Sequence, residues 1–204
     1  MPKKTFLNLS AAKRQRFVKA ARAEFAARNY AAANLDEICR KAGIPKGSLY
    51  QYFENKRDLY DFISHQALDE AWHLLGAFLE KDPPRDCFDM LGKTWMFLEK
   101  MKREEPQLLN IYYRAGYEHK QVNRPIGEHN DAFLDRFLSW GIGEGMIDPK
   151  LDRVAVAFMI DAVSNRFQEE VLFPRRKKMR EKTPPNDLAM KLLELLRRAL
   201  GPLK

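Results

Sequence analysis

The sequence of 204 residues contains only two cysteines, Cys39 and Cys87, and no run of 18 apolar residues. Both cysteines lie in apolar patterns typical of helices, so we expect reduced packing residues and not a disulfide. Without a long apolar run, no membrane-spanning helix is expected. The first ten residues hold two lysines with no apolar stretch behind them, which does not match a secretory signal. We therefore expect a cytoplasmic protein with no membrane partner.

The sequence signatures of common enzyme classes are also missing. The chain has no Gly-rich phosphate loop, no GxSxG, no HExxH and no Cys/His ligand cluster. His65, Asp69 and His73 are spaced by four and share one helix face. The two histidines lie about 12 Å apart along a helix axis, so they cannot both ligate one ion. We expect no catalytic residue, no metal site and no cofactor.

Positive charge is concentrated at one end of the chain. Residues 1–57 hold 13 Lys/Arg against 4 Asp/Glu, whereas residues 58–204 hold 23 against 24. The net charge of +8 therefore belongs to the first quarter of the sequence. Such segregation indicates an N-terminal surface that meets a polyanion. Lys3 and Lys4 belong either to a solvated face or to an arm that reaches over neighbouring DNA backbone or minor groove.

The apolar pattern is helical nearly throughout, with prolines and glycines between the periodic segments. A first helix is predicted over about 10–28, with Asn29 in the left-handed conformation behind it. A second covers 34–43, opening with an asparagine cap and Glu37 as in a capping box, and closing at a glycine. A third covers about 46–52. Two short helices joined by a glycine-containing turn form a helix-turn-helix, whose second helix lies in the DNA major groove.

Residues 17–60, FVKAARAEFAARNYAAANLDEICRKAGIPKGSLYQYFENKRDLY, resemble the N-terminal DNA-binding domain of the TetR (tetracycline-repressor-like) family. Asn29, Asn34 and Cys39 replace residues that are common in the family, and all three departures are physically mild. With the helical pattern, the resemblance implies an all-α protein. The resemblance also implies a helix-turn-helix DNA-binding domain over 1–55 and a helical bundle for effector binding and dimerisation over 56–204. The matching elements are Phe25, Tyr30, Asp36–Glu37–Ile38, Ala42–Gly43, Lys46–Gly47, Leu49–Tyr50, Tyr52–Phe53 and Lys56.

Helical geometry divides the third helix into an inner and an outer face. At 100° per residue, Leu49 and Phe53 point inward and Gln51 lies nearly opposite, where a glutamine can pair with adenine. Tyr50 and Tyr52 flank Gln51 and can give hydroxyls to phosphates, or are half-buried packing residues. The resemblance also implies DNA contacts at the positions that match those of the family, which are Lys46, Ser48, Tyr50, Tyr52 and Lys56. The expected DNA-binding residues are Asn34, Lys46, Gly47, Ser48, Tyr50, Gln51, Tyr52 and Lys56.

The rest of the chain predicts a bundle of long helices. The last helix carries a leucine stripe that would be exposed in a monomer. Two such helices from each of two subunits can bury one another, as the resemblance also implies. The alternative is that this face docks within its own chain. The expected helices cover about 56–80, 86–103, a segment that starts at Pro106, 125–144, 151–172 and 186–200. The expected dimerisation residues are Leu188, Leu192, Leu195, Leu196 and Ala199.

An effector pocket inside the bundle is implied by the resemblance alone, and the sequence adds only lining residues. Asp161 and Asn165 lie four residues apart on an otherwise apolar helix, where they are expected to contact the effector. Alternatively, they form a hydrogen bond inside the subunit or at the subunit interface. Arg114 is expected to hold an anionic effector or to form a surface ion pair. The candidate ligand-binding residues are Trp95, Tyr112, Tyr113, Arg114, Phe137, Asp161 and Asn165.

These expectations combine into one leading function and one alternative. The leading function is a ligand-responsive homodimeric transcription regulator, a repressor that binds a palindromic double-stranded DNA operator and is released by an unknown small-molecule effector. The alternative is a DNA-bound adaptor whose signal is a protein partner.

Overall fold

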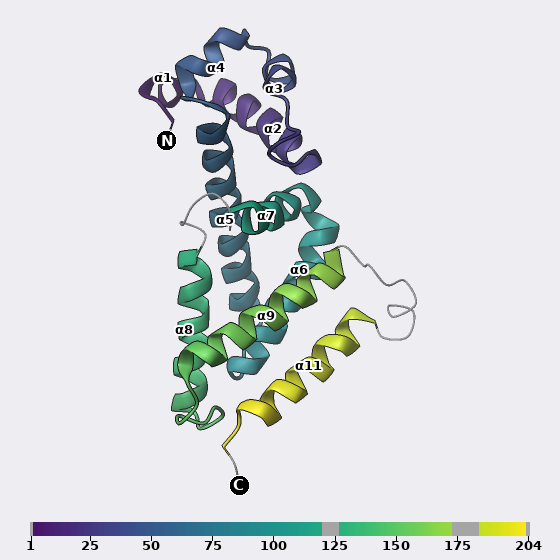
Figure 1. Ribbon diagram of the computed structural model, residues 1–204. Helices are drawn as coiled ribbons and strands as arrows, with labels where there is room; N and C mark the ends of the chain where they lie inside the picture. Colours follow the sequence, from purple (N-terminus) through teal and green to yellow (C-terminus); the bar gives the residue numbers. More distant parts are fainter. Residues whose placement is uncertain (1, 120–126, 173–183, 203–204) are drawn as a thin grey trace. The chain divides into compact units, whose positions relative to one another are not determined.

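The computed structural model describes residues 2–119, 127–172 and 184–202. These residues form helices and turns without a strand, so the predicted all-α class is confirmed (Figure 1). The chain divides into two compact units, one of residues 1–73 with 105–126 and one of residues 74–104 with 127–204. Helix α5 (Lys56–Lys81) contributes residues to both. The functional boundary placed after residue 55 stays a prediction.

The first unit is built around helix α2, which packs against α3 and α7. Its core is rich in aromatic rings, and Phe6, Phe17, Phe25 and Phe53 are fully buried. A short helix precedes α2 and packs on α4. Besides the first part of α5, the unit contains α1 (Lys4–Leu7), α2 (Ala11–Ala27), α3 (Leu35–Ala42), α4 (Lys46–Tyr52) and α7 (Pro106–His119).

Most helix ends of the first unit follow the local sequence signals. The Asn34 side chain caps α3 by accepting the Asp36 N–H at 2.8 Å. Gly43 ends α3 in the left-handed conformation, with φ of 68°. The Asn55 side chain caps α5 by accepting the Asp58 N–H at 2.9 Å. The asparagine cap and the closing glycine predicted for residues 34–43 are therefore confirmed, and Asn55 acts as a second asparagine cap.

Two local predictions are wrong. Glu37 does not complete a capping box, because its carboxylate pairs with Arg40 at 2.7 Å and Lys41 at 3.4 Å. These bonds and charges hold the pKa of Glu37 at about 2. Asn29 is not left-handed, since only glycines have positive φ in the described part of the chain. The Asn29 side chain instead accepts the Ala32 N–H at 2.9 Å, which forms a turn.

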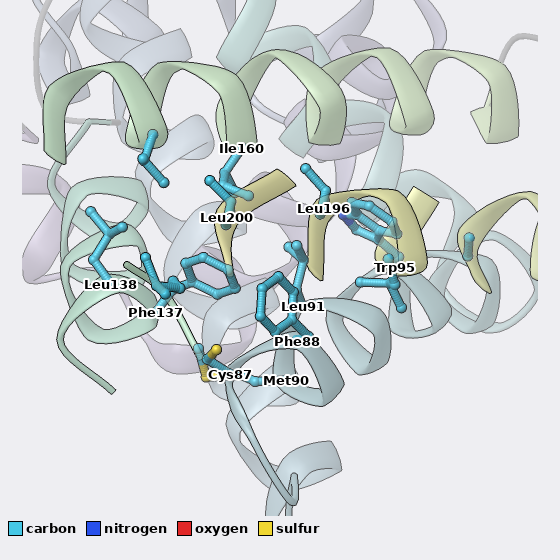
Figure 2. Close-up of a cluster of buried hydrophobic side chains, with 14 of the residues drawn as sticks. Cys87, Phe88, Met90, Leu91, Trp95, Phe137, Leu138, Ile160, Leu196 and Leu200 are labelled. Atoms are coloured by element: carbon cyan, nitrogen blue, oxygen red, sulfur yellow. The ribbon is translucent and has the colours of Figure 1, made fainter. Parts of the chain in front are cut away.

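The second unit packs its helices around one apolar cluster. Figure 2 shows Phe88, Leu91 and Trp95 of α6 facing side chains of three other helices of this unit. Trp95 stacks on Phe167 at 4.7 Å and donates its indole N–H to the Ser164 hydroxyl at 3.2 Å. Besides the last turns of α5, the unit contains α6 (Cys87–Glu104), α8 (Gly127–Gly143), α9 (Arg153–Leu172) and α11 (Pro185–Leu200).

Both cysteines are buried and free, as the sequence predicts. Burial, followed by the charge of neighbouring Asp86, raises the pKa of Cys87 to about 11. Its sulfur lies where α8 approaches closely, because a Cβ at Gly141 would be 2.9 Å from Cys87 Sγ and 2.5 Å from Ile147 Cδ1. Among the described residues, no helix has both the length and the apolar character needed to cross a membrane.

Candidate nucleic-acid interface

Helix α4 has one buried and one exposed face, as the helix-turn-helix reading requires. Leu49 and Phe53 are fully buried, and Gln51 is exposed on the other side. Phe53 lies just beyond the helix in extended conformation, with its N–H donated to the Leu49 carbonyl at 2.9 Å. Ser48 is half-buried near the start of the helix. The inward placement of Leu49 and Phe53 is therefore confirmed, and the outer face presents Gln51 to solvent.

The two tyrosines that flank Gln51 differ in burial. Tyr50 is 45% exposed. Tyr52 is half-buried, and its ring contacts Phe6 at 5.9 Å and Phe17 at 6.1 Å between centroids. The alternative that these tyrosines are half-buried packing residues therefore holds for the ring of Tyr52 but not for the ring of Tyr50. Only the polar end of Tyr52 is suited to contact a phosphate.

Helix α3 is fixed to α2 by a buried carboxylate. Glu24 is 2% exposed and accepts the Asn34 N–H at 3.0 Å. Arg28 bonds the same oxygen at 3.1 Å, and the Lys41 ammonium lies 3.8 Å from the other. A buried carboxylate needs such partners, because an unpaired buried charge is costly. Glu24 therefore sets the start of α3, although its role is not evident in the sequence pattern.

Lys46 is paired with a carboxylate on the outer side of the first unit. Its ammonium lies 2.7 Å from the Asp36 carboxylate, and this bond joins the start of α4 to the start of α3. The hydrogen bond and the charge of Asp36 raise the pKa of Lys46. Exposed ion pairs of this kind contribute little stability, so a phosphate can replace Asp36 at small cost.

Lys56 is held against the turn that follows α2. Its ammonium donates to the Ala31 carbonyl at 3.1 Å and lies 5.1 Å from the centre of the Tyr30 ring. Lys56 is half-buried in this position. Its charge is therefore fixed at the start of α5, next to the turn before α3.

Gly47 has open space around its α-carbon. A Cβ built there meets no atom of the described protein within 4 Å, and its φ is not positive. The packing and backbone of the protein therefore do not require glycine at this position. A missing side chain on the exposed first turn of α4 is instead suited to close approach by a partner.

The sequence reading missed α1, and the segment that carries Lys3 and Lys4 packs on α4 in the structure instead of extending away from it. Residues 4–7 form a helix packed on α4, with Phe6 fully buried. Lys3 bonds to α4 through both its backbone N–H and its side chain. The available signal was Phe6, a single aromatic residue in a polar stretch.

The candidate ligand-binding residues are divided between the two units. Tyr112, Tyr113 and Arg114 are half-buried on α7 in the first unit, where Arg114 donates to the Ala27 carbonyl at 3.4 Å. The second unit holds the other four. Trp95 and Phe137 share the buried apolar cluster. Asp161 and Asn165 bond to each other at 2.9 Å near the surface of α9.

The candidate dimerisation residues of α11 are also divided. Leu196 is buried in the core of its own unit, and Leu188 and Leu192 are half-buried against that core. Leu195 and Ala199 are exposed. One side of the predicted stripe therefore docks within its own chain, and the other side faces solvent.

Comparison with known proteins extends these observations. The family model described as "Bacterial regulatory proteins, tetR family" matches residues 17–62. The chain is 24% identical over 155 residues to the "Probable acrEF/envCD operon repressor" of Escherichia coli (strain K12), covering 72% of this chain and 70% of that protein. It is 29% identical over 160 residues to the "Uncharacterized HTH-type transcriptional regulator YdgC" of Bacillus subtilis (strain 168), covering 76% and 80%. A TetR family transcriptional regulator from Chloroflexus aurantiacus J-10-FL matches 100% of both chains at 26% identity, with a TM-score of 0.67.

Proposed function

Since the chain belongs to the TetR family and is a DNA-binding transcription regulator, we propose that it is a homodimeric repressor released from its operator by a small molecule. The observation that carries the proposal is the outer face of α4. There Gln51 and Tyr50 are exposed above a buried Leu49, on a helix that a glycine-ended α3 precedes. The excess positive charge of residues 1–57 lies in the same part of the sequence.

The residues around Gln51 support distinct roles on a duplex. Gln51 is the base reader, because a glutamine amide matches the adenine edge in the major groove. Tyr50 and Lys46 contact phosphates on the groove walls, and Gly47 lets the backbone of α4 approach the duplex. Ser48, Tyr52, Asn34 and Lys56 complete the proposed contacts. Phosphate contacts set orientation and affinity, whereas the base contact sets preference.

The second unit supports dimerisation through α9 and α11, which pack side by side. Val154 and Phe158 lie one helical turn apart on α9 and are 78% and 76% exposed. On α11 the exposed members of the leucine stripe are Leu195 and Ala199. Apolar side chains this exposed are typical of a contact surface, and two helices from each subunit bury one another as a four-helix interface. Two recognition helices then match a palindromic operator.

The effector is proposed to bind in the helical bundle of the second unit, near Trp95 and Phe137. These aromatic side chains lie in one apolar cluster, and the Trp95–Ser164 hydrogen bond brings polar groups to its edge. A molecule that favours one arrangement of the subunits shifts the population away from the DNA-binding form. Repression itself is supported by the similarity to the Escherichia coli protein described as a "Probable acrEF/envCD operon repressor".

The proposal is tested with duplexes that the purified chain selects from a randomised DNA library at physiological salt. We expect a palindrome whose half-sites are about one helical turn apart. Gln51→Ala should relax preference at one position of each half-site. Tyr50→Phe and Lys46→Met should weaken all duplexes alike. Failure to enrich any duplex contradicts the proposed DNA reading, and an unchanged preference in Gln51→Ala contradicts the base-reader assignment.

The effector part is tested separately by native mass spectrometry of the purified dimer and by thermal shift. A retained small molecule should raise the melting temperature and lower affinity for the selected duplex. If a co-purifying protein, and no small molecule, changes DNA affinity, the chain is the adaptor of the alternative reading.

A further inference from the structure

The last turn of helix α4 is capped by side chains and backbone from the N-terminal segment. Lys3 donates its backbone N–H to the Tyr52 carbonyl at 2.8 Å and its ammonium to the Tyr50 carbonyl at 2.9 Å. The Thr5 hydroxyl donates to the carbonyl between them, that of Gln51. A helix leaves its last four carbonyls without partners inside the helix. Two residues, Lys3 and Thr5, satisfy three of those four in α4.

The fourth carbonyl and the capping segment are both tied to the aromatic core. Leu49 O accepts the N–H of Phe53, which is fully buried. Phe6, next to Thr5, is also fully buried and contacts the Phe53 ring at 5.0 Å and the Phe17 ring at 5.6 Å between centroids. The capping residues are thus carried by a segment with its own anchor. Their bonds to α4 do not depend on a freely moving terminus.

Helix α4 needs such support because it has only seven residues. Isolated helices of this length are not stable in water. Its carboxyl end also carries partial negative charge, which the Lys3 ammonium complements. The bonds from Lys3 and Thr5 reach the turn that presents Tyr50 and Gln51, the residues proposed to meet DNA.

We propose that Lys3 and Thr5 are positioning residues that fix the last turn of α4, so that Gln51 meets its base edge in one orientation. This inference rests on the proposed function of α4 as the recognition helix. It assigns to Lys3 and Thr5 an effect on discrimination between bases, although neither residue reads a base.

The first test measures hydrogen exchange in the free, full-length dimer with any tag at the C-terminus, so DNA binding is not involved. Thr5→Val and Lys3→Met each remove one side-chain donor to α4, and the backbone bond of Lys3 to Tyr52 stays. We expect exchange about three- to tenfold faster across residues 46–53, as loss of a hydrogen bond predicts. Thr5→Ser and Lys3→Arg restore a donor and should restore protection. Lys4→Met is the matched control, because this neighbouring exposed lysine makes none of the three bonds.

The second test compares binding to a duplex selected by the wild-type chain with binding to the same duplex carrying one substituted base pair opposite Gln51. Thr5→Val and Lys3→Met should each reduce this preference about threefold to tenfold, while Lys4→Met leaves it unchanged. The slope of affinity against salt should stay the same in Thr5→Val, since no phosphate contact is lost.

Two outcomes would overturn the inference. One is unchanged exchange and unchanged preference in Thr5→Val. The other is a silent Thr5→Val with a salt slope reduced by about one in Lys3→Met, which would make Lys3 a phosphate contact instead. If the wild-type chain selects no duplex at all, the proposed function fails. The exchange measurement still decides whether the segment holds α4.

Discussion

The carboxylate of Glu24 on α2 accepts the backbone N–H of Asn34, the N-cap of α3, at 3.0 Å. Glu24 is 2% exposed, and the Asn34 side chain in turn accepts the Asp36 N–H. One buried acceptor thus fixes the residue from which α3 begins. The helix that braces α4 therefore takes its position from α2 through a polar contact as well as through apolar packing.

Replacing Glu24 with leucine should destabilise the first unit by about 1–3 kcal/mol, because the Asn34 N–H loses its buried acceptor. Glu24→Gln keeps an acceptor for that N–H and loses only the charge toward Arg28 and Lys41, so it should cost less. Urea unfolding followed by circular dichroism at fixed protein concentration measures both. Equal losses in the two variants would show that the ion pairs, and not the backbone contact, carry the effect.

Gly47→Ala should separate DNA binding from folding. The added methyl meets nothing within 4 Å, and alanine favours a helix. Stability should therefore be unchanged or raised by up to about 1 kcal/mol. Affinity for a selected duplex should fall about tenfold, or about 1.4 kcal/mol, if DNA backbone lies against this position.

Gly76→Ala is the matched control for Gly47→Ala. Gly76 is an exposed residue of α5, and a Cβ there also meets nothing within 4 Å. This variant should gain similar helix stability and keep full DNA affinity. Unchanged affinity in Gly47→Ala would remove Gly47 from the proposed interface.

The parts of the first unit that could be predicted from sequence are those with local signals. The asparagine caps at Asn34 and Asn55 and the glycine at Gly43 act within a few residues, so α3, α4 and the start of α5 were predictable. Helix α1 was not predictable, because its segment is held by bonds from Lys3 to Tyr50 and from Thr5 to Gln51. These partners lie 47 and 46 positions further along the sequence. A four-residue helix also has no apolar period to reveal it.

The faces of the second unit were less predictable for a different reason. Residues 154–163 of α9 are almost entirely apolar, so periodicity could not show which side is buried. The structure buries Val156 and Ile160 and exposes Val154 and Phe158. The packing of α7 against α2 in the first unit likewise depends on contacts across a long separation, such as Arg114 to Ala27.

The Asp86–Arg197 pair predicts a pH-dependent stability of the second unit. Two bonds of 2.7 Å join the Arg197 guanidinium to both oxygens of Asp86, and the guanidinium lies 4.6 Å from the centre of the Phe88 ring. Burial alone would raise the pKa of Asp86, but the Arg197 hydrogen bonds and backbone N–H donors lower it below its ordinary value. The pair therefore stabilises the fold above the unfolded pKa of about 3.9, and this contribution is lost as pH falls through the lower folded pKa.

Asp86→Asn should consequently lower the free energy of unfolding by about 2 kcal/mol at pH 7, and the difference from wild type should shrink at pH 3. Urea unfolding at both pH values measures it. Asp135→Asn, in the exposed pair with Arg153 at 2.9 Å, is the control and should change stability by at most about 0.5 kcal/mol. A difference for Asp86→Asn that does not depend on pH would show that the ionised carboxylate is not its source.

Phe158→Glu should convert the proposed dimer into a monomer, because it places a charge in the centre of the exposed apolar face of α9. Phe158 is exposed in the single chain, so the change should leave the fold of the monomer intact, with unchanged circular dichroism. Analytical ultracentrifugation should show half the mass, and affinity for a palindrome should fall to that for a single half-site. Met96→Glu is the control, since Met96 is an exposed apolar residue on α6, outside the α9–α11 face. A Phe158→Glu chain that stays dimeric would place the subunit contact elsewhere.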